Sequence, residues 1–70
     1  MKIKLNGDFK KIDTDQKSLN LSLVIKKLNL NPKLIVVEFN GLIINKKLWE
    51  DTIVREGAVL EIVTIVGGGS

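Results

Sequence analysis

The C-terminus of this 70-residue chain combines residues that could support chemistry. Gly67, Gly68 and Gly69 follow a strand-forming segment and precede Ser70. Three consecutive glycines weaken a strand and lose much entropy when they are ordered, so we expect a flexible tail over residues 67–70. A terminal carboxylate in such a segment has no bulky side chain beside it. ATP can activate this carboxylate as an acyl-adenylate, and a nucleophile can then displace AMP.

The length of this tail suits delivery of the carboxylate to a partner. Four extended residues reach roughly 13 Å at about 3.3 Å each. That reach is sufficient to thread a carboxylate into an enclosed site while the globular part stays outside. A Cβ atom on Gly67 or Gly68 would widen the channel that the partner needs.

Other candidate sites in the sequence are weaker. Asp13-Thr14-Asp15 offers two carboxylates without further ligands, which favours a solvated loop over a metal site. The glycines at 67–69 do not open a helix, so they do not predict a phosphate-binding loop. The chain has no Cys and no His, which removes the usual zinc ligands and the nucleophile systems that depend on histidine. We expect no bound metal or cofactor.

Composition favours one small soluble domain over residues 1–66. The net charge is +3, but the three aromatic residues (Phe9, Phe39 and Trp49) are not interleaved with basic ones, so nucleic acid is not an expected partner. No apolar run approaches the roughly 20 residues of a membrane span, so no membrane partner is expected either. Lysines that keep exposed edges soluble are the simpler interpretation of the charge.

The first half of the chain predicts a hairpin and a helix. Residues 2–5 alternate polar and apolar, Asn6-Gly7 is a strong hairpin signal, and residues 9–12 return as a second strand. Residues 13–18 form a polar loop. An apolar stripe at helical spacing then predicts a helix over residues 20–29, with Asn20 or Ser18 as its N-cap and Asn29 at its end. The stripe consists of Leu21, Val24, Ile25 and Leu28.

The second half predicts three strands. Residues 34–40 form a central strand, Asn40-Gly41 a turn, and residues 42–44 a short strand. Residues 46–51 are irregular or form one tight helical turn, from which Trp49 plugs one end of the core. Residues 58–65 form the last strand. It places Leu60 and Ile62 on one face, and Val59, Glu61, Val63 and Ile65 on the other.

These elements predict an α+β fold of the β-grasp (ubiquitin-like) type, a mixed sheet of four to five strands. One amphipathic helix covers one face of the sheet, and the first and last strands are neighbours. The other face then stays open. Four apolar side chains point from it and predict a partner-docking surface: Val36, Val59, Val63 and Ile65. Scattered surface valines, or cover by residues 46–51, are the alternatives.

Four segments carry a close resemblance to a known family: MKIKLNG at the start, LNLNPKLIVVEFNG at 28–41, REGAVLEIV at 55–63 and VGGG at 66–69. Together they resemble the ThiS-type ubiquitin-like sulfur carriers of thiamin biosynthesis. The resemblance implies that a ubiquitin-activating-like enzyme adenylates Gly69 with ATP. Sulfur from a cysteine desulfurase then gives a thiocarboxylate, which donates sulfur to thiazole synthase. The chain would be a protein co-substrate, not an enzyme.

Several alternatives stay open on the sequence alone. The family ends on glycine, so Ser70 is trimmed, tolerated or artificially added. A molybdopterin-type sulfur carrier, a protein-conjugating modifier and an inert β-grasp binding module share the fold. The resemblance implies a cytoplasmic protein, or one of the plastid stroma if it is plastid-encoded.

Overall fold

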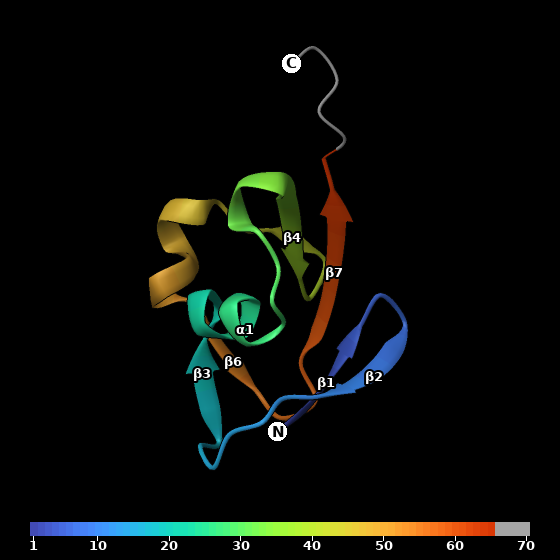
Figure 1. Cartoon of the computed structure of the whole chain (residues 1–70), viewed down its shortest axis with the longest axis vertical. Coiled ribbons are helices and arrows are strands. Elements are labelled where there is room, and N and C mark those ends of the chain that lie inside the picture. Colours follow the sequence, from blue (N-terminus) through green and yellow to red (C-terminus); the bar gives the residue numbers. More distant parts are fainter. Residues whose placement is uncertain (66–70) are drawn as a thin grey trace.

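The computed structural model describes residues 1–65, which form one mixed sheet, a small second sheet and a single α-helix (Figure 1). The predicted tail at 67–70 and the predicted domain boundary at residue 66 lie outside the described residues. The elements are β1 (Lys2–Leu5), β2 (Asp8–Lys11), β3 (Ser18–Asn20), α1 (Leu21–Lys27), η1 (Pro32–Leu34), β4 (Ile35–Phe39), β5 (Leu42–Ile43), η2 (Lys46–Asp51), β6 (Ile53–Arg55) and β7 (Val59–Thr64), where η denotes a 3-10 helix.

The main sheet has the strand order β2-β1-β7-β4-β5. β1 and β7 pair in parallel, and the other neighbours pair antiparallel. The first and last strands are therefore adjacent at the centre of a mixed five-stranded sheet. This arrangement confirms the predicted β-grasp fold.

Two Asn-Gly turns connect the hairpins of this sheet. Asn6 and Gly7 have φ angles of 50° and 86°, and Asn40 and Gly41 have 51° and 87°. A two-residue hairpin turn of type I′ needs positive φ at both positions, which Asn tolerates and Gly adopts freely. The sequence signal for both hairpins is confirmed.

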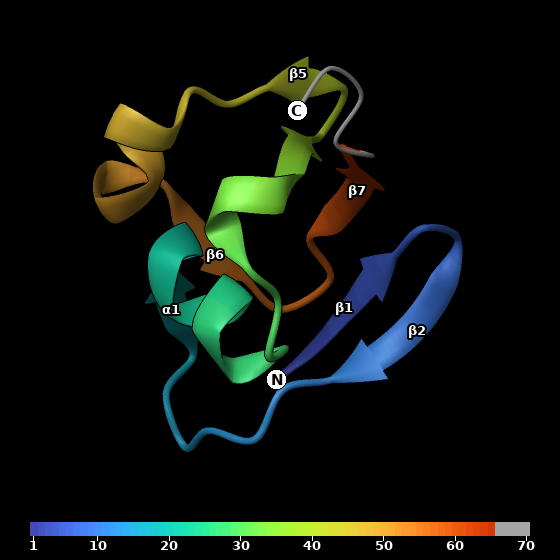
Figure 2. The same ribbon diagram turned by 45° about the horizontal axis from the view of Figure 1, so that its top comes forward.

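Helix α1 lies on one side of the sheet (Figure 2). Asn20 is its N-cap, because its side chain accepts a hydrogen bond from the Leu23 backbone N–H at 2.9 Å. The helix is shorter than the predicted 20–29, since the chain tightens after Lys27 and Asn29 takes a left-handed φ of 59°. Ser18, the competing cap, lies instead in β3.

The β3–β6 pair was not predicted. Leu19 faces Val54 across this pair, and both side chains are buried. A backbone bond from Leu21 N to the Thr52 carbonyl at 2.8 Å continues the pairing into the helix. Three-residue strands are too short to show a period-2 pattern, so the prediction of a loop through residue 18 was wrong at its end.

The core lies between the sheet, α1 and the β3–β6 pair. Trp49 closes one end of it from η2 and donates its Nε1–H to the Ile44 carbonyl at 3.0 Å. Within residues 1–65 no polar or charged side chain is buried. The buried apolar residues are Ile3, Ile12, Leu19, Leu21, Val24, Ile25, Ile35, Val37, Trp49, Val54 and Leu60.

Candidate docking face and chain exit

β7 presents two different faces, as the alternation of its residues predicts. Leu60 is fully buried against the core and Ile62 is partly buried, whereas Val63 is 61% exposed. The face assignment of the last strand is therefore confirmed. β7 runs along the long axis of the molecule to Ile65, where the described chain ends (Figure 1).

The register between β4 and β7 places the predicted docking residues. Val36 lies directly opposite Val63. Ile65 is 49% exposed, and its N–H donates to the Leu34 carbonyl at 2.6 Å, so the pairing continues to that residue. The structure therefore brings Val36, Val63 and Ile65 together at the end of β7 from which the chain continues.

Val59, the fourth predicted docking residue, lies at the other end of β7. Glu61 stands between Val59 and Val63 on the same face, and Glu38 is its direct cross-strand partner. The predicted surface is therefore interrupted by two carboxylates rather than continuously apolar.

The sequence interpretation missed two exposed apolar side chains on this face. Phe9 is 71% exposed and lies opposite Lys4, which in turn neighbours Val59. Ile43 is 70% exposed and lies opposite Glu38. The hairpin register set by each Asn-Gly turn could have located both, because paired residues of a ladder point to the same face.

The segment η2 does not cover the open face. It contacts α1 and β3, on the helix side of the sheet (Figure 2). That alternative for residues 46–51 is wrong, since the buried Trp49 fixes the segment on the core side.

Asn6 holds β7 close to its end. Its Oδ1 accepts a hydrogen bond from the Ile62 N–H at 2.7 Å, and its Nδ2 donates to the Ile62 carbonyl at 3.2 Å. The Asn6 backbone N–H also donates to the Leu60 carbonyl at 2.9 Å. The side-chain amide thus takes the place of another strand residue and extends the β1–β7 ladder beyond Leu5.

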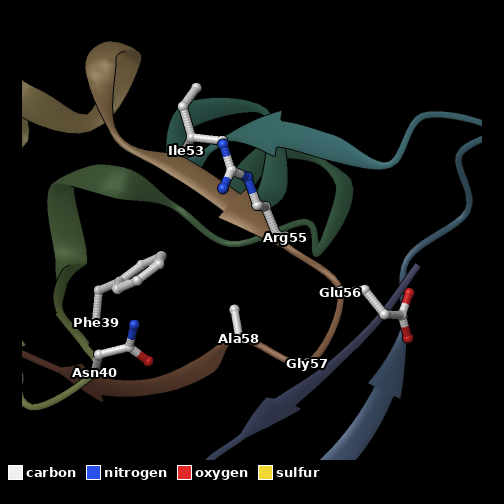
Figure 3. Close-up of a pocket in the computed structure, with 7 residues that line it drawn as sticks. All are labelled: Phe39, Asn40, Ile53, Arg55, Glu56, Gly57 and Ala58. Atoms are coloured by element: carbon white, nitrogen blue, oxygen red, sulfur yellow. The ribbon is translucent and has the colours of Figure 1, made fainter.

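A hollow of about 500 Å³ lies near the start of β7 (Figure 3). The Phe39 ring and the Ala58 methyl group point toward it, while the Glu56 carboxylate points away. Glu56 Oε1 accepts a hydrogen bond from the Lys2 backbone N–H at 3.0 Å. The hollow is separated from Ile65 by the length of β7, about 20 Å at ~3.3 Å per residue, so it is not the exit site of the chain.

Residues 1–65 contain no group of three or more His, Cys, Asp or Glu side chains placed to hold a metal ion. No helix in this part of the chain has the length and apolar character to cross a membrane. The predicted reactive residues Gly67, Gly68 and Gly69, together with Ser70, lie outside the described residues.

Comparisons with known proteins identify a family, two relatives in sequence and two solved structures. The sequence model of the ThiS family matches residues 3–69. An uncharacterized protein, ycf40, of Trieres chinensis is 42% identical over 52 residues, which cover 74% of this chain and 71% of that protein. The ycf40 protein of Porphyra purpurea is 33% identical over 51 residues, covering 73% of this chain and 72% of the relative.

Solved structures give the same result. The crystal structure of the thiamine biosynthesis protein ThiS from Geobacter metallireducens superposes with a TM-score of 0.85 at 27% identity, covering 99% of this chain and 100% of that one. The solution NMR structure of a thiamine biosynthesis protein from the same organism gives a TM-score of 0.79 at 27% identity, covering 100% of this chain and 90% of that one.

Proposed function

Because the chain belongs to the ThiS family, we propose that it is a sulfur carrier of thiamin (thiazole) biosynthesis and acts as a protein co-substrate. The observation that carries this proposal is the extent of the family match, which runs from residue 3 through the three glycines to Gly69. A match restricted to the globular part would support only the fold.

The proposed chemistry takes place on the main-chain carboxylate of Gly69, which is formed when the Gly69–Ser70 peptide bond is hydrolysed. A carboxylate oxygen attacks the α-phosphorus of ATP in a ubiquitin-activating-like enzyme, and pyrophosphate leaves. A persulfide sulfur, supplied from a cysteine desulfurase, attacks the acyl carbon and AMP leaves. A second thiol then cleaves the S–S bond, which leaves the thiocarboxylate on Gly69 and a disulfide on the sulfur donor. The resulting thiocarboxylate donates its sulfur to thiazole synthase. The family match ends at Gly69, which supports this residue rather than Ser70 as the acyl donor.

The open face supports the docking step of this proposal. The exposed Val63 and Ile65 and the half-buried Val36 form an apolar group at the end of β7 from which the chain continues. A partner that packs on this group lies beside the strand that leads into the glycines. Contiguous exposed apolar surface commonly marks an interaction site.

The relatives suggest where the protein works. The relatives from Trieres chinensis and Porphyra purpurea share the name ycf40, and we infer that they are plastid-encoded proteins. We therefore place this sulfur carrier in the plastid stroma, beside its activating enzyme.

Intact-protein mass spectrometry tests the proposal. After incubation with ATP, the activating enzyme and a sulfur source, the carrier should gain the mass difference between sulfur and oxygen. Addition of thiazole synthase and its other substrates should reverse that gain. An unchanged mass of the chain that ends at Gly69, in a reaction that converts a known ThiS protein, would refute the sulfur-carrier role. Reversal by molybdopterin synthase instead of thiazole synthase would assign the other pathway.

Two variants of the tail test the threading step. Gly68→Val should block ATP–pyrophosphate exchange, and Gly68→Ala should slow it, because each added carbon widens the channel that the tail needs. Comparison of chains that end at Gly69 and at Ser70 tests which residue reacts. Equal exchange rates for Gly68→Val and the wild type would contradict threading.

A further inference from the structure

We propose that the open sheet face is divided into two oppositely charged zones, which fix the orientation in which the activating enzyme docks. The acidic pair consists of Glu38 and Glu61 on β4 and β7. The basic edge consists of Lys2, Lys4 and Lys11 on β1 and β2. The enzyme should present a cationic side chain opposite the acidic pair and an anionic one opposite the basic edge. This inference rests on the proposed function, which supplies the partner.

The acidic pair is a built feature of the sheet. Glu38 and Glu61 are direct cross-strand partners, so their Cβ atoms are about 4.5–5.5 Å apart on one face. Like charges in this position destabilise a sheet. The register surrounds the pair with apolar side chains: Val36, Val59, Val63 and Ile43.

This setting suits a guanidinium group. Two carboxylates can accept its N–H donors together, while its planar surface rests on the neighbouring aliphatic side chains. A cation in this position would also relieve the repulsion between Glu38 and Glu61. The bound state would therefore gain an interaction that the free carrier lacks.

The basic edge lies across the same face. Lys2 is the cross-strand partner of Lys11, and Lys4 is the partner of Phe9. The Lys2 Nζ lies 5.3 Å from the centre of the Phe9 ring, which confirms that these side chains share a face. Glu56 lies at the end of this edge, where its carboxylate is bound to the Lys2 backbone N–H.

The spacing of the two zones determines their effect. β7, which carries Glu61, pairs directly with β1, and Glu61 is the diagonal neighbour of Lys4 at about 7–8 Å, while Glu38 lies one strand farther away. The two zones therefore lie within about one Debye length of each other, and the charge of the face changes sign from β4 to β2. A uniformly charged partner surface would be attracted by one zone and repelled by the other. Only one orientation satisfies both zones, and it fixes the position of Ile65 at the end of β7 relative to the enzyme.

Matched charge reversals test this division. Glu61→Lys should weaken binding of the activating enzyme at least tenfold at about 50 mM salt, because like charges across an interface are strongly unfavourable. Its control is Glu50→Lys, which makes the same charge change at an exposed position in η2 on the helix side and should stay within about twofold of wild type. Lys4→Glu should weaken binding in the same way, with Lys47→Glu in η2 as its control.

The thermal stability of Glu61→Lys shows whether weaker binding is caused by unfolding. Glu61→Lys replaces a like-charge pair by an opposite-charge pair with Glu38, so its thermal midpoint should equal or exceed that of wild type. Weaker binding by a more stable protein excludes unfolding as the cause. The difference between Glu61→Lys and wild type should shrink at about 500 mM salt.

The possible results separate this inference from the function on which it rests. If the chain that ends at Gly69 is not adenylated, the proposed function fails. If it is adenylated while Glu61→Lys binds as well as Glu50→Lys, the charge division is refuted and the function stands. If sedimentation shows a wild-type dimer that Glu61→Lys dissociates, the face pairs with a second copy and the proposal is also overturned.

Discussion

The two Asn-Gly turns allow one structural contribution to be measured directly. Asn6 and Asn40 have nearly the same backbone conformation, with φ angles of 50° and 51°, and each precedes a glycine. Only Asn6 uses its side chain to hold a neighbouring strand, through two hydrogen bonds to the backbone of Ile62. Within residues 1–65, Asn40 has no side-chain hydrogen bond of this kind. Substitution of either Asn by Ala therefore removes the same turn preference. Only the Asn6 substitution also removes two hydrogen bonds.

The expected difference follows from the hydrogen bonds and their exposure. An alanine at positive φ costs about 1 kcal/mol in either turn. The Asn6 variant additionally loses two hydrogen bonds, worth about 0.5–1 kcal/mol each because water can reach the freed groups of Ile62. We expect Asn6→Ala to lose about 2–3 kcal/mol of unfolding free energy and Asn40→Ala about 1 kcal/mol. For a domain of this size the thermal midpoints should then differ by about 4–15 °C.

Urea unfolding followed by circular dichroism measures both variants. Asn6→Asp provides an intermediate case, since it keeps the acceptor for the Ile62 N–H and loses the donor to the Ile62 carbonyl. Its stability should lie between wild type and Asn6→Ala. Equal losses for Asn6→Ala and Asn40→Ala would show that the side-chain amide does not hold β7, and would refute the reasoning.

Three further predictions test the face, the core and the small sheet. Ile65→Glu and Ile65→Asn should both weaken binding of the activating enzyme about tenfold while the unfolding free energy stays nearly unchanged. Leu60→Glu, at a fully buried position, should unfold the domain. If Ile65→Glu is unfolded, the face assignment of β7 is reversed. Trp49→Phe should lower the free energy of unfolding in urea by about 1–3 kcal/mol, because the Ile44 carbonyl loses its hydrogen-bond partner. An unchanged urea midpoint would show that this hydrogen bond does not stabilise the fold. If β6 belongs to the core, Val54→Ala should lower the free energy of unfolding measured by calorimetry by about 1.5–3 kcal/mol. A loss below about 0.5 kcal/mol would show that β6 does not contribute to the core.

Features with a strong local signal could be predicted from the sequence. The stripe of Val24 and Ile25 with its neighbours places α1, because helical periodicity is visible in a single segment. Asn6-Gly7 and Asn40-Gly41 locate both hairpins, since few other dipeptides adopt two positive φ angles. The alternation in β7 assigns Leu60 and Val63 to opposite faces in the same way.

Features that depend on pairing between distant segments could not be predicted in this way. β3 and β6 have three residues each, and their partners are more than 30 positions apart in the sequence. The acidic pair exists only because β4 and β7 have a particular register. The basic edge likewise requires the hairpin pairing of Lys2 with Lys11. Lysines that are scattered along the chain become a group only after the strands are aligned, which is why the charge division was missed.

The register of one strand pair sets both the docking face and the chain exit. Among the described residues, β7 beyond Ile62 pairs only with β4, and the Ile65 N–H ends that ladder on the Leu34 carbonyl. A slip of one residue would turn Val63 and Glu61 toward the core and Leu60 toward solvent, because side chains alternate along a strand. The same slip would displace Ile65 relative to β4. Burial of Leu60 therefore holds the acidic pair, the apolar group and Ile65 in one arrangement, so a partner that recognises the face lies beside the end of β7.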